Sequence, residues 1–486
     1  MKDRTKTCGG AAVAPRVQSA RLTALEPPDA APASDPAPTP LPTIDGYVAD
    51  SLYPSTFHAA FAPAWLDAIL AWHRLRPPRA PRAPFTFVDL GCGDGAGLML
   101  LAAAHPEGRF IGLDAMAAHV ALGQARAAEI GLDNVELHCR GFAEAGDMPV
   151  GKADYVASQG VLAWVSPANQ AALLDLAVRM LRPGGIFCVG YNSLPGWSRI
   201  AGFQRLVRAL ADGHPGNSRE RFEAALAQIR AGEMVPKAVL DWIKTDKLPP
   251  DYFAQEYLNR HWTPLWSGDV IAAAAARGLV FAGQAHPSRV RPEFTLRKAW
   301  REALAGIADP AAREIAADLY VDSFYREDIF SRGETERLAD DEARSLRLAQ
   351  VWASRSGTDV KFECRSAAGR VSFDNAAARA ILARLEDGPA RLADVPEIGP
   401  EDLLNTIDAL HLAGLVVPLD PAVGVPHAAA ANRRLCGALA GTSRNARVGA
   451  NGVVVVPNDL EPHSPEVVRR LALPPDDGLA RPSGAK

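Results

Sequence analysis

The chain has 486 residues and a nearly balanced charge, with 52 Lys and Arg against 56 Asp and Glu. A hydrophobic content of 48% provides enough material for large buried cores, and the length suggests two to four domains. The net charge of −4 argues against a protein that grips nucleic acid by charge, and without a run of about 18 apolar residues no membrane-spanning helix is expected.

Cysteine usage indicates a reducing compartment. The polar residues before Cys8 contain no apolar run of the kind that a secretory signal needs. No C-x-x-C pair and no metal-ligand spacing is present, so we expect a cytoplasmic protein without a metal site. The six cysteines are far apart in the sequence: Cys8, Cys92, Cys139, Cys188, Cys364 and Cys436.

The first 44 residues are rich in Pro and Ala and have almost no periodic apolar content. Such a segment cannot bury enough surface to offset its chain entropy, so residues 1–44 are expected to be disordered. Order is expected to begin near Tyr47. Pro63 suits the first position of a helix over 63–73, where apolar residues repeat on one face.

Strands and helices then alternate from residue 85 to residue 191. This rhythm is typical of a doubly wound, mostly parallel sheet of the Rossmann-like α/β class, which we assign to residues 45–202. A glycine-rich loop, 91–97, follows the first strand, and Arg182-Pro183-Gly184-Gly185 precedes the fifth. The predicted strands are 85–90, 110–114, 135–138, 153–158 and 186–191.

The second half of the chain divides less regularly. Residues 203–300 combine a helical insertion, 203–262, with a helix–Gly–strand unit in which the sheet resumes. The remaining segments are a charged helical connector over 301–355, a small winged-helix-like domain over 356–422 and a loosely ordered extension over 423–486.

The glycine loop carries the clearest chemistry. Gly91-x-Gly93-x-x-Ala96 formally fits the dinucleotide fingerprint, which would indicate a nicotinamide enzyme. However, Asp89 precedes the loop and Asp94 lies within it. Because a pyrophosphate avoids nearby anions, these carboxylates suit a ligand that carries a positive charge.

The string from Val88 to Gly95, with Asp114 placed 25 residues after Asp89, resembles the first motifs of class I S-adenosylmethionine methyltransferases. The resemblance implies S-adenosylmethionine as the cofactor, a loop that wraps its amino-acid part, and Asp114 as acceptor of the two ribose hydroxyls. Gly141 and Phe142 match the region that lines adenine. The full set of cofactor-binding residues that it implies is Asp89, Gly91, Cys92, Gly93, Asp94, Gly95, Asp114, Ala115, Gly141, Phe142 and Gln159.

Three further strings narrow the family. Residues 53–57, 191–197 and 256–265 resemble bacterial methyltransferases with a methyltransferase regulatory domain, a group that includes lysine methyltransferases of outer-membrane proteins. The resemblance spans about 47–420. One departure is Gln159-Gly160, where His-Gly is expected, and it bears on substrate specificity.

This resemblance implies a protein substrate with lysine as the acceptor. Tyr191, Asn192 and Trp164 follow the carboxyl ends of strands, where open parallel sheets bind ligands, and are candidate catalytic residues. His261, in the segment that leaves the insertion, can exchange a proton near neutrality. The tryptophans could equally be packing residues, and the insertion is expected to form a lid over the acceptor entrance.

Two other functions stay open. The chain could methylate a small molecule or a glycan, or it could be a regulatory or scaffold protein that binds the nucleoside without chemistry. The intact loop and Asp114 argue against a dead site. Few basic residues lie between Lys361 and Pro418, so a DNA-binding role for the small domain is not expected. A homodimer is left open.

Overall fold

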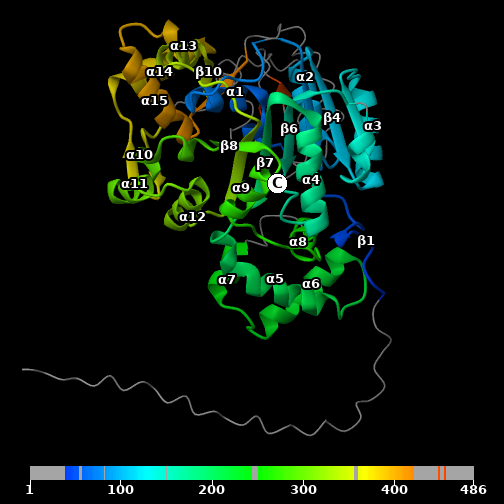
Figure 1. Cartoon of the computed structure of the whole chain (residues 1–486). Coiled ribbons are helices and arrows are strands. Elements are labelled where there is room, and N and C mark those ends of the chain that lie inside the picture. Colours follow the sequence, from blue (N-terminus) through cyan, green and yellow to red (C-terminus); the bar gives the residue numbers. More distant parts are fainter. Residues whose placement is uncertain are drawn as a thin grey trace, which may run out of the picture.

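The computed structural model describes residues 39–53, 57–81, 83–148, 150–243, 250–354 and 360–420, together with two short paired strands, β15 (Arg447–Val448) and β16 (Val454–Val455) (Figure 1). The predicted disorder before residue 39 and most of the predicted extension 423–486 lie outside these residues. The described chain includes the short hairpin of β1 (Thr43–Ile44) and β2 (Tyr47–Val48), just before the helix α1 (Pro63–Trp72).

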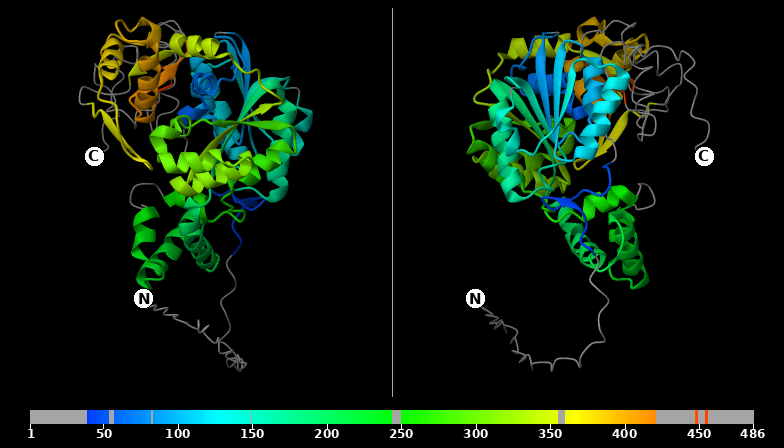
Figure 2. Two further views of the ribbon diagram at one scale, coloured as in Figure 1. Left: turned by 60° about the vertical axis from the view of Figure 1, so that its left-hand side comes forward. Right: turned by 90° about the vertical axis from the view of Figure 1, so that its right-hand side faces the viewer.

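A seven-stranded sheet forms the centre of the molecule, in the order β5-β4-β3-β6-β7-β9-β8 (Figure 2). The first five strands in this order are parallel, and β9 pairs antiparallel with both β7 and β8. The doubly wound, mostly parallel α/β architecture is thus confirmed. Its strands are β3 (Phe85–Leu90), β4 (Gly108–Asp114), β5 (Val135–Cys139), β6 (Ala153–Gln159), β7 (Leu181–Asn192), β8 (Leu279–Gln284) and β9 (Tyr325–Arg332).

Helices cover both faces of this sheet, so each face has its own apolar core (Figure 2). Along β3, Phe85 and Phe87 lie in one core while Val88 and Leu90 lie in the other, as the two-residue period of a strand requires. The helices that connect or flank the strands are α2 (Ala96–Ala104), α3 (Ala117–Ile130), α4 (Pro167–Met180) and α9 (Ser267–Ala275).

The predicted helical insertion lies at one end of the sheet (Figure 1). Its core is aromatic: Phe222 stacks on Phe253 with ring centroids 5.8 Å apart, and Phe203 meets the edge of Tyr257 at 5.3 Å. This packing gives the insertion a core separate from those of the sheet. Its helices are α5 (Ala201–Ala211), α6 (Ser218–Ala231), α7 (Lys237–Ile243) and α8 (Pro250–Tyr257).

The expectation of a wholly helical connector over 301–355 is wrong at β9, which lies inside the sheet. The charged residues of β9 are buried: the Arg326 guanidinium donates to Asp318 at 2.8 Å and to Asp328 at 2.9 Å. A sequence with so many charged residues predicts a solvent-exposed helix. In the structure these residues are buried, and opposite charges neutralise one another. The helices around β9 are α10 (Pro292–Thr295), α11 (Lys298–Ala305), α12 (Pro310–Val321) and α13 (Asp340–Ala349).

The small C-terminal unit contains both expected helices and the expected strand pair. It begins at β10 (Val351–Ser354), earlier than the predicted boundary at residue 356, because β10 pairs with β13 and β14. Its identity as a winged helix stays a prediction. The other elements are β11 (Glu363–Ser366), β12 (Gly369–Ser372), α14 (Ala376–Glu386), β13 (Ala390–Arg391), α15 (Pro400–Leu412) and β14 (Val416–Leu419).

Candidate active site

The glycine loop after β3 turns at three residues with positive φ, which are Gly91 (+89°), Gly93 (+57°) and Gly95 (+69°). Gly91 is required by space as well, because a Cβ there would lie 2.4 Å from the Val161 side chain. At Gly93 nothing lies within 4 Å of such a Cβ, so the backbone borders open space. The loop therefore offers bare backbone to a ligand at the carboxyl edge of the sheet.

Asp114 ends β4 and is tied to this loop. Its carboxylate accepts hydrogen bonds from the backbone N–H of Gly93 at 3.0 Å and of Met116 at 2.8 Å. His119 Nδ1 lies 3.3 Å from the same carboxylate, and its Nε2 accepts from the Tyr53 N–H at 3.0 Å. Since Nε2 is the acceptor, the ring proton of the neutral imidazole is on Nδ1 and points to Asp114.

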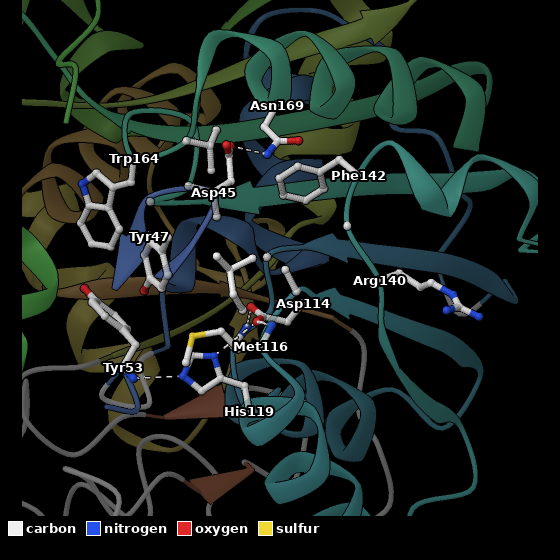
Figure 3. Close-up of a pocket in the computed structure, with 18 of the residues that line it drawn as sticks. Asp45, Tyr47, Tyr53, Asp114, Met116, His119, Arg140, Phe142, Trp164 and Asn169 are labelled. Atoms are coloured by element: carbon white, nitrogen blue, oxygen red, sulfur yellow. Dashed lines mark hydrogen bonds and ion pairs between the residues drawn. The ribbon is translucent and has the colours of Figure 1, made fainter. Parts of the chain in front are cut away.

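A cavity of about 320 Å³ opens beside the loop and Asp114 (Figure 3). Eight of the residues expected at the site line it: Gly91, Gly93, Asp114, Ala115, Gly141, Phe142, Gln159 and Trp164. Four residues that the sequence did not single out as site residues also contribute to its wall: Asp45, Tyr47, Tyr53 and His119. Residues far apart in the chain thus meet at the carboxyl ends of β3, β4 and β6.

The remaining cofactor candidates do not line the cavity. The Asp94 carboxylate accepts from the Ala96 N–H at 3.1 Å and pairs with Arg126, so it holds the start of α2. Burial raises the pKa of the Cys92 thiol well above its usual range, which makes it a poor nucleophile. Burial and the charge of Asp114 raise the pKa of Asp89 to about 7.

Of the four catalytic candidates, only Trp164 lines the cavity. Tyr191 is fully buried, and its hydroxyl donates to Asp328 at 2.5 Å, within the network around Arg326. The Asn192 side chain donates to Glu256 at 3.1 Å, and His261 is half-buried outside the lining. Catalytic roles for Tyr191, Asn192 and His261 stay predictions.

One wall of the cavity is aromatic (Figure 3). The Trp164 ring stacks on Tyr47 with centroids 6.3 Å apart, and the edge of Tyr53 meets Trp164 at 5.5 Å. We call these three residues the aromatic wall. Aromatic faces attract cations, so this wall suits a positively charged group beside the cavity.

The segment 43–53 is a strap across the cavity that the sequence did not reveal. Asp45 accepts from the side chains of Ser166 at 2.5 Å and Asn169 at 2.6 Å, at the start of α4. The Val48 N–H donates to Asn259 at 2.9 Å, beyond the end of α8. The strap thus joins the sheet to the insertion, and the only sequence signal for it was the pair of tyrosines after a Pro/Ala-rich segment.

The described residues contain neither a membrane-spanning helix nor a cluster of metal-binding side chains. None of the helices in these ranges combines the length and hydropathy needed to cross a bilayer. Within the same residues, no group of three or more His, Cys, Asp or Glu side chains is placed to hold a metal ion.

Comparison with known proteins gives two domain matches. Residues 87–185 match the methyltransferase domain, and residues 249–332 match the predicted methyltransferase regulatory domain. The first match spans β3 to the middle of β7, and the second spans α8 to the end of β9.

Relatives and solved structures are similar at lower identity. An uncharacterized protein of Synechocystis sp. is 26% identical over 363 residues, which cover 72% of this chain and 71% of the relative. A trans-aconitate 2-methyltransferase of Azoarcus sp. is 33% identical over 104 residues, 21% of this chain and 38% of the relative. The structure of PKMT2 from Rickettsia typhi in complex with AdoHcy has a TM-score of 0.63 at 18% identity and covers 83% of this chain and 86% of that chain. Together with the two domain matches, these findings identify the chain as a class I methyltransferase that uses S-adenosylmethionine and carries a methyltransferase regulatory domain.

Proposed function

We propose that this enzyme methylates a side-chain amine of a protein, with lysine as the acceptor. The observation that carries the proposal is the aromatic wall of Tyr47, Tyr53 and Trp164 beside the loop and Asp114. Such a wall suits an amine that arrives with a positive charge. The fold neighbour PKMT2 from Rickettsia typhi was solved in complex with AdoHcy, which supports methyl transfer in this fold.

The cavity also fits the cofactor. Gly93 leaves open space where a side chain would otherwise stand, and Asp114 and Phe142 line the same cavity. We infer that the loop backbone at Gly91 and Gly93 holds the amino-acid part, Asp114 receives the ribose hydroxyls and Phe142 lies against adenine. When bound, S-adenosylmethionine supplies a methyl group on a positively charged sulfur, and the protein positions the acceptor in line with it.

An amine acceptor must lose its proton first. With an ordinary pKa near 10.4, only about 1 lysine in 2500 is neutral at pH 7, which costs about 4.6 kcal/mol. An apolar, aromatic entrance lowers this pKa because burial disfavours the charged form. The Trp164 side chain is 8% exposed, so the wall keeps water away from the place where the amine must arrive.

A small-molecule acceptor is the second candidate. The Azoarcus relative is a trans-aconitate 2-methyltransferase, whose name indicates a small carboxylate substrate. Arg140 belongs to the cavity lining, but its guanidinium points away from Asp114 and the aromatic wall (Figure 3). The relative matches only 104 residues, however, which is 21% of this chain.

The two candidates separate in one labelling experiment. The protein is incubated with methyl-labelled S-adenosylmethionine and a cell lysate, and macromolecules are then separated from small molecules. We expect label in protein, sensitive to protease, and much less label with the Asp114→Ala variant at a limiting cofactor concentration. Label confined to small molecules would establish the second candidate instead.

A further inference from the structure

Glu256, on α8, is a buried acid without a recorded cationic partner in the described part of the chain. It is 3% exposed, its carboxylate accepts from the Asn192 side chain at 3.1 Å, and the Tyr252 hydroxyl donates to it. Asp408, which is 5% exposed, instead lies between Arg347 at 2.6 Å and Arg291 at 2.8 Å. Burying a carboxylate without a cation costs free energy, and a bound positive charge would offset that cost. Glu256 is therefore suited to bind a positively charged group.

Glu256 lies outside the cavity lining and is connected to the aromatic wall through Tyr252. Tyr53, in the wall, packs against Tyr252 with centroids 6.0 Å apart, and Tyr252 bonds to Glu256. A second route starts at Gln159 in the cavity lining, whose side chain donates to the Tyr325 hydroxyl at 3.2 Å. Tyr325 pairs across the sheet with Asn192, the residue that donates to Glu256. The acid is therefore joined to the cavity from two sides.

In the described part of the chain, the groups found around Glu256 are the Asn192 amide, the Trp262 indole and several tyrosines, none of which carries a positive charge. The titratable ones are Tyr47 on β2, Tyr53 after it, Tyr252 and Tyr257 on α8, and Tyr325 on β9. All have pKa values raised by burial, so they stay protonated near neutrality. Burial likewise raises the pKa of Glu256 to about 7, where a carboxyl can both hold and release a proton.

We propose that Glu256 binds the ammonium group of the acceptor lysine and takes one proton from it before methyl transfer. This inference rests on the proposed function. The proton moves from nitrogen to a Glu256 oxygen, which leaves a neutral amine and a carboxylic acid. The nitrogen lone pair then forms the bond to the methyl carbon as the carbon–sulfur bond breaks, and the product is a methylated ammonium group.

The groups that connect Glu256 to the cavity include the aromatic rings of Tyr53, Tyr252 and Tyr325, so the acceptor must be long and narrow to approach this acid. A lysine meets that requirement, because its apolar stem can lie against Tyr53 and Trp164 while its head reaches Glu256. A carboxylate substrate would meet a buried acid of the same charge. The residue therefore selects the acceptor class as well as assisting the chemistry.

The test uses n-butylammonium as a lysine side-chain probe and n-butanol as its neutral counterpart, each titrated into full-length protein saturated with S-adenosylhomocysteine. Wild type is expected to bind the ammonium more tightly than the alcohol, and Glu256→Gln should weaken ammonium binding by about 10–100-fold with alcohol binding unchanged. The matched control is Asp251→Asn on the same helix, where the side chain is 39% exposed. Its binding should equal that of wild type, and cofactor affinity should be the same in all three proteins.

The proton-transfer step has its own readout in single-turnover methylation of a lysine-rich peptide library. The rate of wild type should fall on the acid side of a pH profile, and Glu256→Gln should shift that limb upward by more than about one pH unit. Equal ammonium binding and an unshifted profile in Glu256→Gln would overturn the inference while the proposed function stands. Wild type that binds the ammonium but methylates no peptide would overturn the proposed function instead.

Discussion

Replacing Asp114 by Ala gives the sharpest test of the cofactor site. In the protein the carboxylate is held by the Gly93 and Met116 N–H groups and faces His119, so it is fixed in place before any ligand arrives. A charge-assisted hydrogen bond is worth about 1.5–3 kcal/mol, and two ribose hydroxyls compete with these existing bonds. We therefore expect a loss of about 2–4 kcal/mol, or roughly 30–1000-fold in the dissociation constant.

Calorimetric titration with S-adenosylmethionine measures this change directly. Asp133→Ala, an exposed acid just after α3, is the matched control and should bind as wild type does. Circular dichroism checks that Asp114→Ala is folded. Unchanged affinity in a folded Asp114→Ala protein would refute the assignment of Asp114 to the ribose.

Three further predictions concern packing and buried charge. The Trp262 ring lies 5.6 Å from the Trp197 ring and outside the cavity lining. Trp262→Ala should therefore lower the free energy of unfolding in urea by about 3–5 kcal/mol and leave cofactor affinity unchanged. Wild-type stability with lost activity would instead make Trp262 part of the acceptor entrance. Arg326→Met leaves Asp328 buried without its cation and Asp318 with Arg289 alone, and should cost about 3–5 kcal/mol; wild-type stability would contradict that account of β9. Burial and the Asp328 charge raise the pKa of Glu327 to about 7, so the stability it contributes is present below its unfolded pKa and lost as pH rises through about 7. Glu327→Gln should therefore raise the melting temperature at pH 8 and change it little at pH 4, and equal shifts at both pH values would show that ionisation is not the cause.

Most of the fold could be predicted from the sequence because its signals are local. The glycine loop, the alternating strands and the helix that starts at Pro63 each follow from residues close together in the chain. β9 could not be found this way. Arg326, Glu327 and Asp328 look like a solvated surface, and only partners far away in space, such as Asp318, make their burial tolerable.

The candidate site could be predicted from the sequence to a similar extent. Asp114 and Gly93 belong to motifs with fixed spacing, and both line the cavity. Asp94 lies in the same motif, but its carboxylate pairs with Arg126. No local sequence pattern predicts that pairing. The strap depends on contacts between segments about 200 residues apart, such as Val48 with Asn259, and Glu256 is held by Asn192, 64 residues earlier, so no spacing rule could have revealed either.

The strap also explains how a cofactor cavity can be enclosed. Asp45 and Tyr53 reach the sheet domain through Ser166 and His119, and Val48 reaches the insertion through Asn259. Asp45, Tyr47 and Tyr53 line the cavity, so a ligand bound beside Asp114 lies next to this segment. The His119 ring accepts a hydrogen bond from Tyr53 of the strap and faces the Asp114 carboxylate with its other nitrogen. His119 therefore links the strap to Asp114.

Methyl transfer to lysine is the central claim, and mass spectrometry of a treated protein mixture tests it most directly. One half of the mixture is acetylated on its amines beforehand, and both halves are incubated with the enzyme and S-adenosylmethionine. We predict additions of about 14 daltons, the mass of one CH₂, on lysine residues of the untreated half and none in the acetylated half, because acetylation removes the amine's charge and lone pair. Equal methylation of both halves, or no methylated lysine in either, would contradict the account.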